Sequence, residues 1–227
     1  MPFVFSPPAQ ASVPVAGSAE HFPVHRIYCV GRNYADHSIE MGDTGREAPF
    51  FFMKPADAVL PVTQGTIGVM PYPPMTQDLQ HEIELVVAIG QGGKDIAVVD
   101  AAAHIWGYAI GLDMTRRDLQ GAAKKLGRPW CTGKGFDCSA PIGPLHRNAP
   151  AGTISLHVNG MPVQAGLLGN MIWNVAETIA QLSTLFTLQA GDLIFTGTPA
   201  GVAAVRRGDL LEGRIEGLGS LQVRIDQ

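Results

Sequence analysis

The chain has 227 residues, of which 46% are hydrophobic and 16% charged, and its formal net charge is −4. The hydrophobic content argues against disorder, and the acidic balance provides no basic field to attract nucleic acid or an anionic membrane surface. Because no apolar stretch is long enough to cross a bilayer and the N-terminus lacks a signal-peptide pattern, we expect a cytoplasmic protein with no membrane partner. The three cysteines show no CxxC spacing, so reduced thiols are expected rather than disulfides.

The predicted elements begin with an N-terminal extended arm, residues 1–25, which is rich in proline and alanine. No linker or repeat interrupts the remainder, so residues 26–227 are expected to form a single domain. Short runs of β-branched and aromatic residues, each bounded by turn residues, predict strands at 27–30, 50–53, 82–89, 105–112, 153–158, 193–196 and 221–225.

Turn and helix signals are fewer. Asn159-Gly160 lies between two such runs and indicates a type I′ hairpin turn. Helices are expected over 116–126 and over 174–185, where Asn174 and Glu177 have the spacing of a capping box. Because helices are too sparse for a repeated βαβ pattern, the sequence predicts a β-rich α+β fold with mostly antiparallel or mixed sheets and a few short helices.

Three acidic residues form the most informative chemical pattern. Alternation along a strand places Glu82 and Glu84 on one face, and Asp113 follows the apolar run 105–112. Together these carboxylates could hold one Mg²⁺ or Mn²⁺ ion, because such cations prefer oxygen ligands, and leave coordination positions for water and substrate. Considered singly, the two glutamates could be a solvated strand face and Asp113 a helix cap.

A second pattern lies just after the first predicted strand of the body. If residues 34–41 are helical, His37 and Glu40 are three residues apart on one face and can form a hydrogen bond. A carboxylate-oriented imidazole is a common way to activate water at neutral pH. An ordinary surface salt bridge would have the same spacing.

Three weaker features complete the pattern. Lys134 stands between glycines in what resembles an exposed turn. The segment Thr196-Gly197-Thr198-Pro199 could hold a carboxylate through its hydroxyl and backbone N–H groups, or it could be only a tight turn. The basic residues of helix 116–126 are expected to be solvated, with Arg117 as an exception because it lies one turn from Asp113.

With these segments in chain order, the sequence resembles the fumarylacetoacetate hydrolase family from Arg26 to the C-terminus. The matching motifs are Gly31-Arg32-Asn33-Tyr34 with His37 and Glu40, Phe52-Met53-Lys54-Pro55, His81-Glu82-Ile83-Glu84-Leu85, Gly107-Tyr108 through Asp113, Arg117-Asp118, Lys134, and Thr196-Gly197-Thr198-Pro199. Each motif is short, but their presence together and in this order is specific.

The resemblance implies a largely antiparallel, β-roll-like fold that assembles as a homodimer. It implies one Mg²⁺ or Mn²⁺ ion held by the matching Glu82, Glu84 and Asp113. The further roles that it implies are water activation by His37 and Glu40 and contact with the substrate's oxygens by Lys134, Gln120 and Thr198.

The closer likeness is to small members of the family that cleave fumarylpyruvate in gentisate degradation, and residues 13–17 and 50–55 carry it. The expected substrate is therefore a diketoacid, an acylpyruvate, and its distal carboxylate would meet Arg32, Arg46 or Arg117. Oxaloacetate decarboxylation or tautomerisation, or a broad acylpyruvase activity, is the alternative, because it would use the same ligands. A more remote alternative is a non-catalytic module that binds a metal or another ligand.

Overall fold

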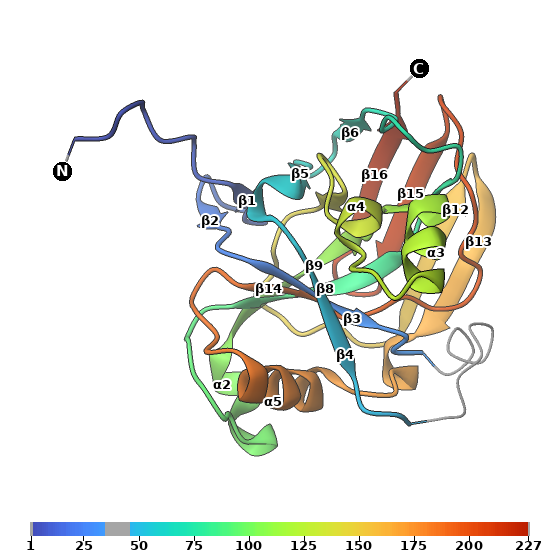
Figure 1. The fold of residues 1–227 in the computed structure, drawn as a ribbon. Helices are drawn as coiled ribbons and strands as arrows, with labels where there is room; N and C mark the ends of the chain where they lie inside the picture. Colours follow the sequence, from blue (N-terminus) through green and yellow to red (C-terminus); the bar gives the residue numbers. More distant parts are fainter. Residues whose placement is uncertain (1, 35–45, 227) are drawn as a thin grey trace.

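The computed structural model describes residues 2–34 and 46–226 and arranges them as two large sheets, two small two-stranded sheets and a few short helices (Figure 1). The predicted β-rich α+β class with mixed sheets is confirmed. Among the described residues, no helix has the length and apolar character needed to span a bilayer.

The larger sheet has seven strands and is mixed, and it carries most of the candidate site. In spatial order its strands are β4 (Phe50–Lys54), β3 (Ile27–Gly31), β14 (Leu193–Phe195), β8 (Ile83–Ile89), β9 (Ile105–Leu112), β11 (Ala140–Ile142) and β5 (Val59–Pro61). β3 pairs in parallel with β14, and β11 with β5, whereas the other neighbours are antiparallel. β4 and β5 are therefore the two edges of this sheet.

The second sheet has five strands, in the order β13 (Met161–Leu167), β12 (Thr153–Val158), β15 (Leu210–Ile215), β16 (Gly219–Ile225) and β6 (Ile67–Met70). The turn between β12 and β13 has positive φ at Asn159 (52°) and Gly160 (79°), which is the signature of the predicted type I′ turn. The hairpin prediction implied the strand β13 without giving its bounds, whereas the sequence did not indicate β15, because Gly213 interrupts its pattern.

Two smaller pairs of strands complete the sheets. β1 (Ser12–Pro14) and β2 (His21–Pro23) form an antiparallel hairpin whose Val13 and Phe22 are buried. This hairpin lies within the segment expected as an extended arm, and the residues before it extend away from the body in Figure 1. β7 (Leu79–Gln80) pairs with β10 (Thr115–Arg116) beside the site.

The helices are short. The two predicted helices are confirmed as α3 (Arg117–Lys125) and α5 (Val175–Leu185), and Asn174 and Glu177 form the expected capping box on α5. The structure adds two single-turn helices and three 3₁₀ turns, namely α2 (Ala101–His104), α4 (Cys131–Lys134), Ala56–Ala58, Val98–Asp100 and Leu168–Asn170.

Strand β8 is buried on both faces, and its alternation divides the core. Ile83, Leu85 and Val87 belong to the larger hydrophobic cluster, whereas Val86 and Ala88 belong to a second cluster on the opposite face. Glu84 lies in phase with that second face, as alternation predicts. Glu82 was predicted to lie within the strand, but the strand begins at Ile83.

Buried Asn33 ties three segments together at the end of β3. Its Nδ2 donates to the backbone oxygens of Trp173 (2.9 Å) and Thr196 (2.8 Å), and its Oδ1 accepts from the Trp173 N–H (2.7 Å). One amide group therefore joins β3, the end of β14 and the residues before α5. A side chain without both donor and acceptor cannot make these bonds.

We expect Asn33→Asp to lower the free energy of unfolding by about 2–4 kcal/mol, because two buried carbonyls lose their donor and face a carboxylate. Urea denaturation followed by circular dichroism measures this loss. The matched control is Asn148→Asp at an exposed loop position, which should stay within about 0.5 kcal/mol of the wild type. Equal stability of Asn33→Asp and the control would contradict the role given to this amide.

Candidate metal centre and substrate pocket

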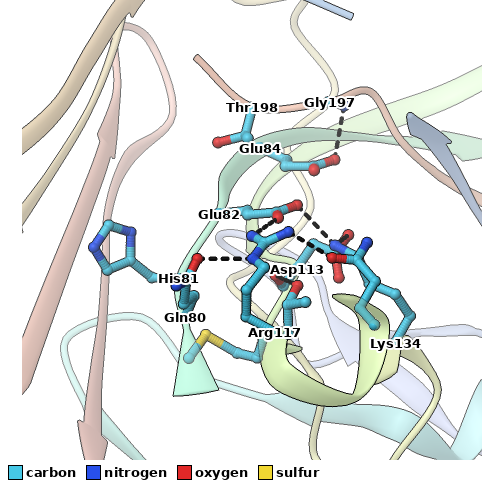
Figure 2. A network of polar contacts seen from close by, with 12 residues as sticks. Gln80, His81, Glu82, Glu84, Asp113, Arg117, Lys134, Gly197 and Thr198 are labelled. Atoms are coloured by element: carbon cyan, nitrogen blue, oxygen red, sulfur yellow. Dashed lines mark hydrogen bonds and ion pairs between the residues drawn. The ribbon is translucent and has the colours of Figure 1, made fainter. Parts of the chain in front are cut away.

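Three buried carboxylates converge where β8 and β9 meet. Antiparallel pairing sets Ile83 opposite Leu112, so Glu82, just before β8, and Asp113, just after β9, are neighbours. With Glu84 on β8, each of the three offers an oxygen, and these oxygens all lie within 4.8 Å of one another. Figure 2 shows the group converging beside Lys134. The three carboxylates that the sequence singled out are therefore brought together.

Three cations surround these carboxylates. Lys134 Nζ lies 2.8 Å from Glu82 Oε2 and 2.7 Å from Asp113 Oδ2, bridging the two groups. Arg117 forms an ion pair with Glu82 Oε1, and Lys54 Nζ lies 2.8 Å from Asp113 Oδ1. Because such pairing offsets much of the cost of burying charge, the cluster can be held inside the fold.

The protonation states follow from these contacts. Burial alone would raise the pKa of Glu82, but the Lys134 ammonium and the Arg117 guanidinium hold that pKa below its ordinary value. Burial and the charges of Asp113 and Glu82 raise the pKa of Glu84 well above its ordinary value. Burial would lower the pKa of Lys134, yet its two carboxylate partners raise it above its ordinary value and favour the ammonium form.

Glu84 is held from the opposite side by the segment after β14. The Gly197 N–H donates to Glu84 Oε2 at 2.7 Å (Figure 2). Gly197 has φ +95°, and a Cβ there would lie 2.7 Å from the Cβ of Asn33, so glycine is required on both counts. The segment 196–199 was predicted to hold a carboxylate or form a tight turn, and the carboxylate that it holds is that of Glu84.

The donor set suits a hard divalent cation. With all six side chains ionised, the three carboxylates and three cations cancel, so a divalent ion would give the cluster a net charge of +2. Asp113 Oδ1 is buried and contacts Lys54 Nζ as an ion pair at 2.8 Å, without an aligned hydrogen bond from any described residue. An all-carboxylate set is what Mg²⁺ and Mn²⁺ prefer. These residues therefore fit the expected ion.

Five of the six side chains predicted to contact substrate line one small pocket beside the carboxylates, which we call the inner pocket. Its walls include Arg32, Gln120, Thr198 and Arg117, together with Glu82, Glu84 and Lys134. Arg117 also donates to Gln120 Oε1 (2.7 Å) and Gln80 Oε1 (2.7 Å). Its partner among the carboxylates is Glu82, and not Asp113 as its helical spacing suggested.

Three other expectations about site residues have different outcomes. Lys134 was predicted to lie in an exposed turn, and this was wrong, because Lys134 ends helix α4 and is only 2% exposed. His37 and Glu40 lie outside the described residues. Arg46, one of three candidates for a distal carboxylate, instead pairs with Glu177 and lies over the Trp173 ring.

The sequence analysis missed two buried polar residues of the site. Lys54 lies buried on edge strand β4 and was named only as part of a family motif. The feature that could have identified it is a lysine on the same face of an apolar strand as Phe52. Gln164 carried no signal. Its Oε1 lies 2.8 Å from His81 Nδ1, and its Nε2 donates to Thr198 Oγ1 (2.8 Å). It thereby links the residue before Glu82 to the segment 196–199.

Residues 26–226 match the family described as fumarylacetoacetate (FAA) hydrolase C-terminal. The chain is 43% identical over 187 residues to a fumarylpyruvate hydrolase of Ralstonia sp., covering 81% of this chain and 95% of that protein. It is 39% identical over 206 residues to a mitochondrial oxaloacetate tautomerase of Rattus norvegicus, covering 88% and 91% respectively.

Among solved structures, a fumarylpyruvate hydrolase from Pseudomonas aeruginosa in complex with Mn²⁺ and pyruvate superposes with a TM-score of 0.97. It is 53% identical to this chain, and the match covers 99% of both chains. Such similarity over the whole length extends to the arm that precedes residue 26.

We expect Glu84→Gln to weaken Mn²⁺ binding at least about 10-fold, because one anionic ligand becomes neutral. The fold should persist, since glutamine mimics a protonated carboxyl and can still accept from the Gly197 N–H. Electron paramagnetic resonance of free Mn²⁺ during titration measures the affinity. Glu20→Gln, at an exposed loop position, is the charge-matched control. Unchanged affinity in Glu84→Gln would remove this residue from the metal centre.

Proposed function

The chain belongs to the fumarylacetoacetate hydrolase family, and on that premise we propose that it hydrolyses a carbon–carbon bond of an acylpyruvate. The observation that supports this proposal most is the buried group of Glu82, Glu84 and Asp113, open to a pocket and surrounded by cations. A site of this kind can bind a dianionic diketoacid and stabilise charge that develops on its oxygens.

The reaction consumes one water. Its hydroxyl joins the acyl carbonyl carbon, and the bond from that carbon to the methylene group breaks. The electron pair goes to the pyruvyl fragment, which leaves as an enolate and takes a proton to become pyruvate. The acyl fragment leaves as a carboxylate. The difficult step is expulsion of the enolate, so catalysis must come from stabilising negative charge there.

We assign Glu82, Glu84 and Asp113 as ligands of one Mg²⁺ or Mn²⁺ ion. The ion supplies Lewis-acid stabilisation of negative charge on the substrate's oxygens when it is bound. Lys134 adds a fixed positive charge beside the same oxygens, because its two carboxylate partners keep it protonated. Gln120 and Thr198, on the walls of the inner pocket, orient the pyruvyl end through hydrogen bonds.

Water activation is assigned to His37, oriented by Glu40. Both lie outside the described residues, so these roles rest on the motif Gly31-Arg32-Asn33-Tyr34 that precedes them and on their spacing. Arg32 follows β3 directly and lines the inner pocket. It is proposed as a contact for a substrate oxygen.

Fumarylpyruvate is the acylpyruvate that we propose, and the products are then fumarate and pyruvate. The names of the Ralstonia sp. relative and of the Pseudomonas aeruginosa structure support this choice. Tautomerisation or decarboxylation of oxaloacetate is the second candidate, supported by the relative from Rattus norvegicus. The homodimer, the cytoplasmic location and a place in gentisate degradation stay predictions.

We expect turnover of fumarylpyruvate that stops with EDTA and returns with Mg²⁺ or Mn²⁺, because the enolate leaving group needs the cation. Loss of the diketoacid's ultraviolet absorbance gives the rate, and chromatography identifies fumarate and pyruvate. Oxaloacetate is assayed in parallel. Faster reaction of oxaloacetate than of fumarylpyruvate or acetylpyruvate would move the function to the second candidate.

We expect His37→Ala to keep Mn²⁺ affinity within about 3-fold of the wild type while kcat for acylpyruvate falls about 100-fold or more, the range of lost general-base catalysis. The same titration and absorbance assays measure both quantities. His157→Ala, at a partly buried position on β12, is the control for loss of one imidazole. Normal hydrolysis by His37→Ala would show that another group activates water.

A further inference from the structure

The inner pocket is too small for a whole acylpyruvate. Its cavity volume is about 30 Å³, which corresponds to roughly two water molecules. Glu82, Glu84 and Lys134 line that space, so the reacting pyruvyl end of the substrate must lie there. The rest of the acyl chain therefore needs additional volume.

A second cavity, the outer cavity, adjoins the inner pocket and has a volume of about 370 Å³. Residues 50–53 of edge strand β4 form one side of it, and residues 128–131 form the other. The two cavities share four walls, namely Phe50, Phe52, Trp130 and Lys134. Because the same side chains border both spaces, the outer cavity lies directly beside the inner pocket, on the other side of these rings.

Aromatic rings form the boundary between the two cavities. Phe50 and Trp130 meet edge to face, with ring centroids 5.5 Å apart and planes at 85°. Phe52 packs against Trp130 at 5.8 Å, and Lys134 Nζ lies 5.0 Å from the Phe52 centroid. The Phe50 ring rests on Gly31, where a Cβ would come within 2.0 Å of Phe50 Cζ. Flat aromatic walls of this kind suit a planar, conjugated acyl chain.

The outer cavity also has its own cation. Arg128 lines it, follows α3 and is exposed. Among the described residues, none of the ion pairs involves Arg128, whereas Arg117, Lys134 and Lys54 are all paired with the metal carboxylates. An anionic group that reaches the outer cavity would thus meet a guanidinium that can bind it in a bidentate manner.

We propose that the outer cavity binds the distal acyl group of the substrate, and that Arg128 pairs with the carboxylate at its far end. This inference rests on the proposed acylpyruvate hydrolysis and adds the basis of selectivity among acylpyruvates. Arg128 is a residue that the sequence patterns did not single out for this contact. Short substrates such as oxaloacetate leave the outer cavity unused, so its presence favours a long, dicarboxylic diketoacid.

The test compares kcat/KM for fumarylpyruvate, which has a distal carboxylate, with that for acetylpyruvate, which has none. Arg128→Met should lower the ratio of the two values about 10- to 100-fold, as expected for loss of a charged hydrogen bond. Arg128→Lys should restore part of the ratio. Lys125→Met, which removes an exposed cation at the end of the same helix, is the matched control and should leave the ratio unchanged.

Direct binding gives a second measurement that is independent of turnover. Fumarate should quench the fluorescence of Trp130 in the wild type and bind at least about 10-fold more weakly to Arg128→Met. The variant Trp130→Phe tests whether Trp130 is the tryptophan whose fluorescence fumarate quenches. A selectivity ratio that is the same in Arg128→Met and Lys125→Met would overturn the inference while the acylpyruvate hydrolase activity stands. Absence of hydrolysis of both substrates by the wild type would instead overturn the proposed function, and the inference with it.

Discussion

The burial of three carboxylates within 4.8 Å of one another is the constraint on which the rest of this structure depends. Each buried ion costs several kcal/mol unless it is paired, and like charges at this separation repel. The fold meets this constraint with one cation from each of three elements: Lys54 from edge strand β4, Arg117 from α3 and Lys134 from α4. The larger sheet and helices α3 and α4 are therefore held together at one point, and that point is the candidate metal centre.

The same arrangement explains why the outer cavity lies beside the candidate metal centre. The segment that leads to Lys134 packs against β4, with Trp130 against Phe50 and Phe52. Trp130 and Lys134 line the inner pocket, and residues 128–131 face strand β4 across the outer cavity. Charge neutralisation and the proposed substrate selectivity thus involve the same segment.

The predictions that were confirmed depend on local patterns. Alternation placed Glu84 in phase with the second face of β8, and backbone preferences located the turn at Asn159-Gly160. The capping box on α5 needs only residues three apart, and it was found. Predictions that depended on where distant segments meet were less complete. Lys134 was placed in an exposed turn, since glycine neighbours are typical of turns and the sequence does not show which segment covers them.

The sequence by itself determined seven of the strands, the two main helices, the family and the three carboxylates, because periodicity, caps and short motifs are set by residues close together in the chain. Only the tertiary structure decided the ionic partners. Lys54 and Asp113 are 59 residues apart, and Gln164 reaches His81 across 83 residues. Such pairs form because a buried charge or amide must find a partner wherever the fold provides one, and that choice has no local signature.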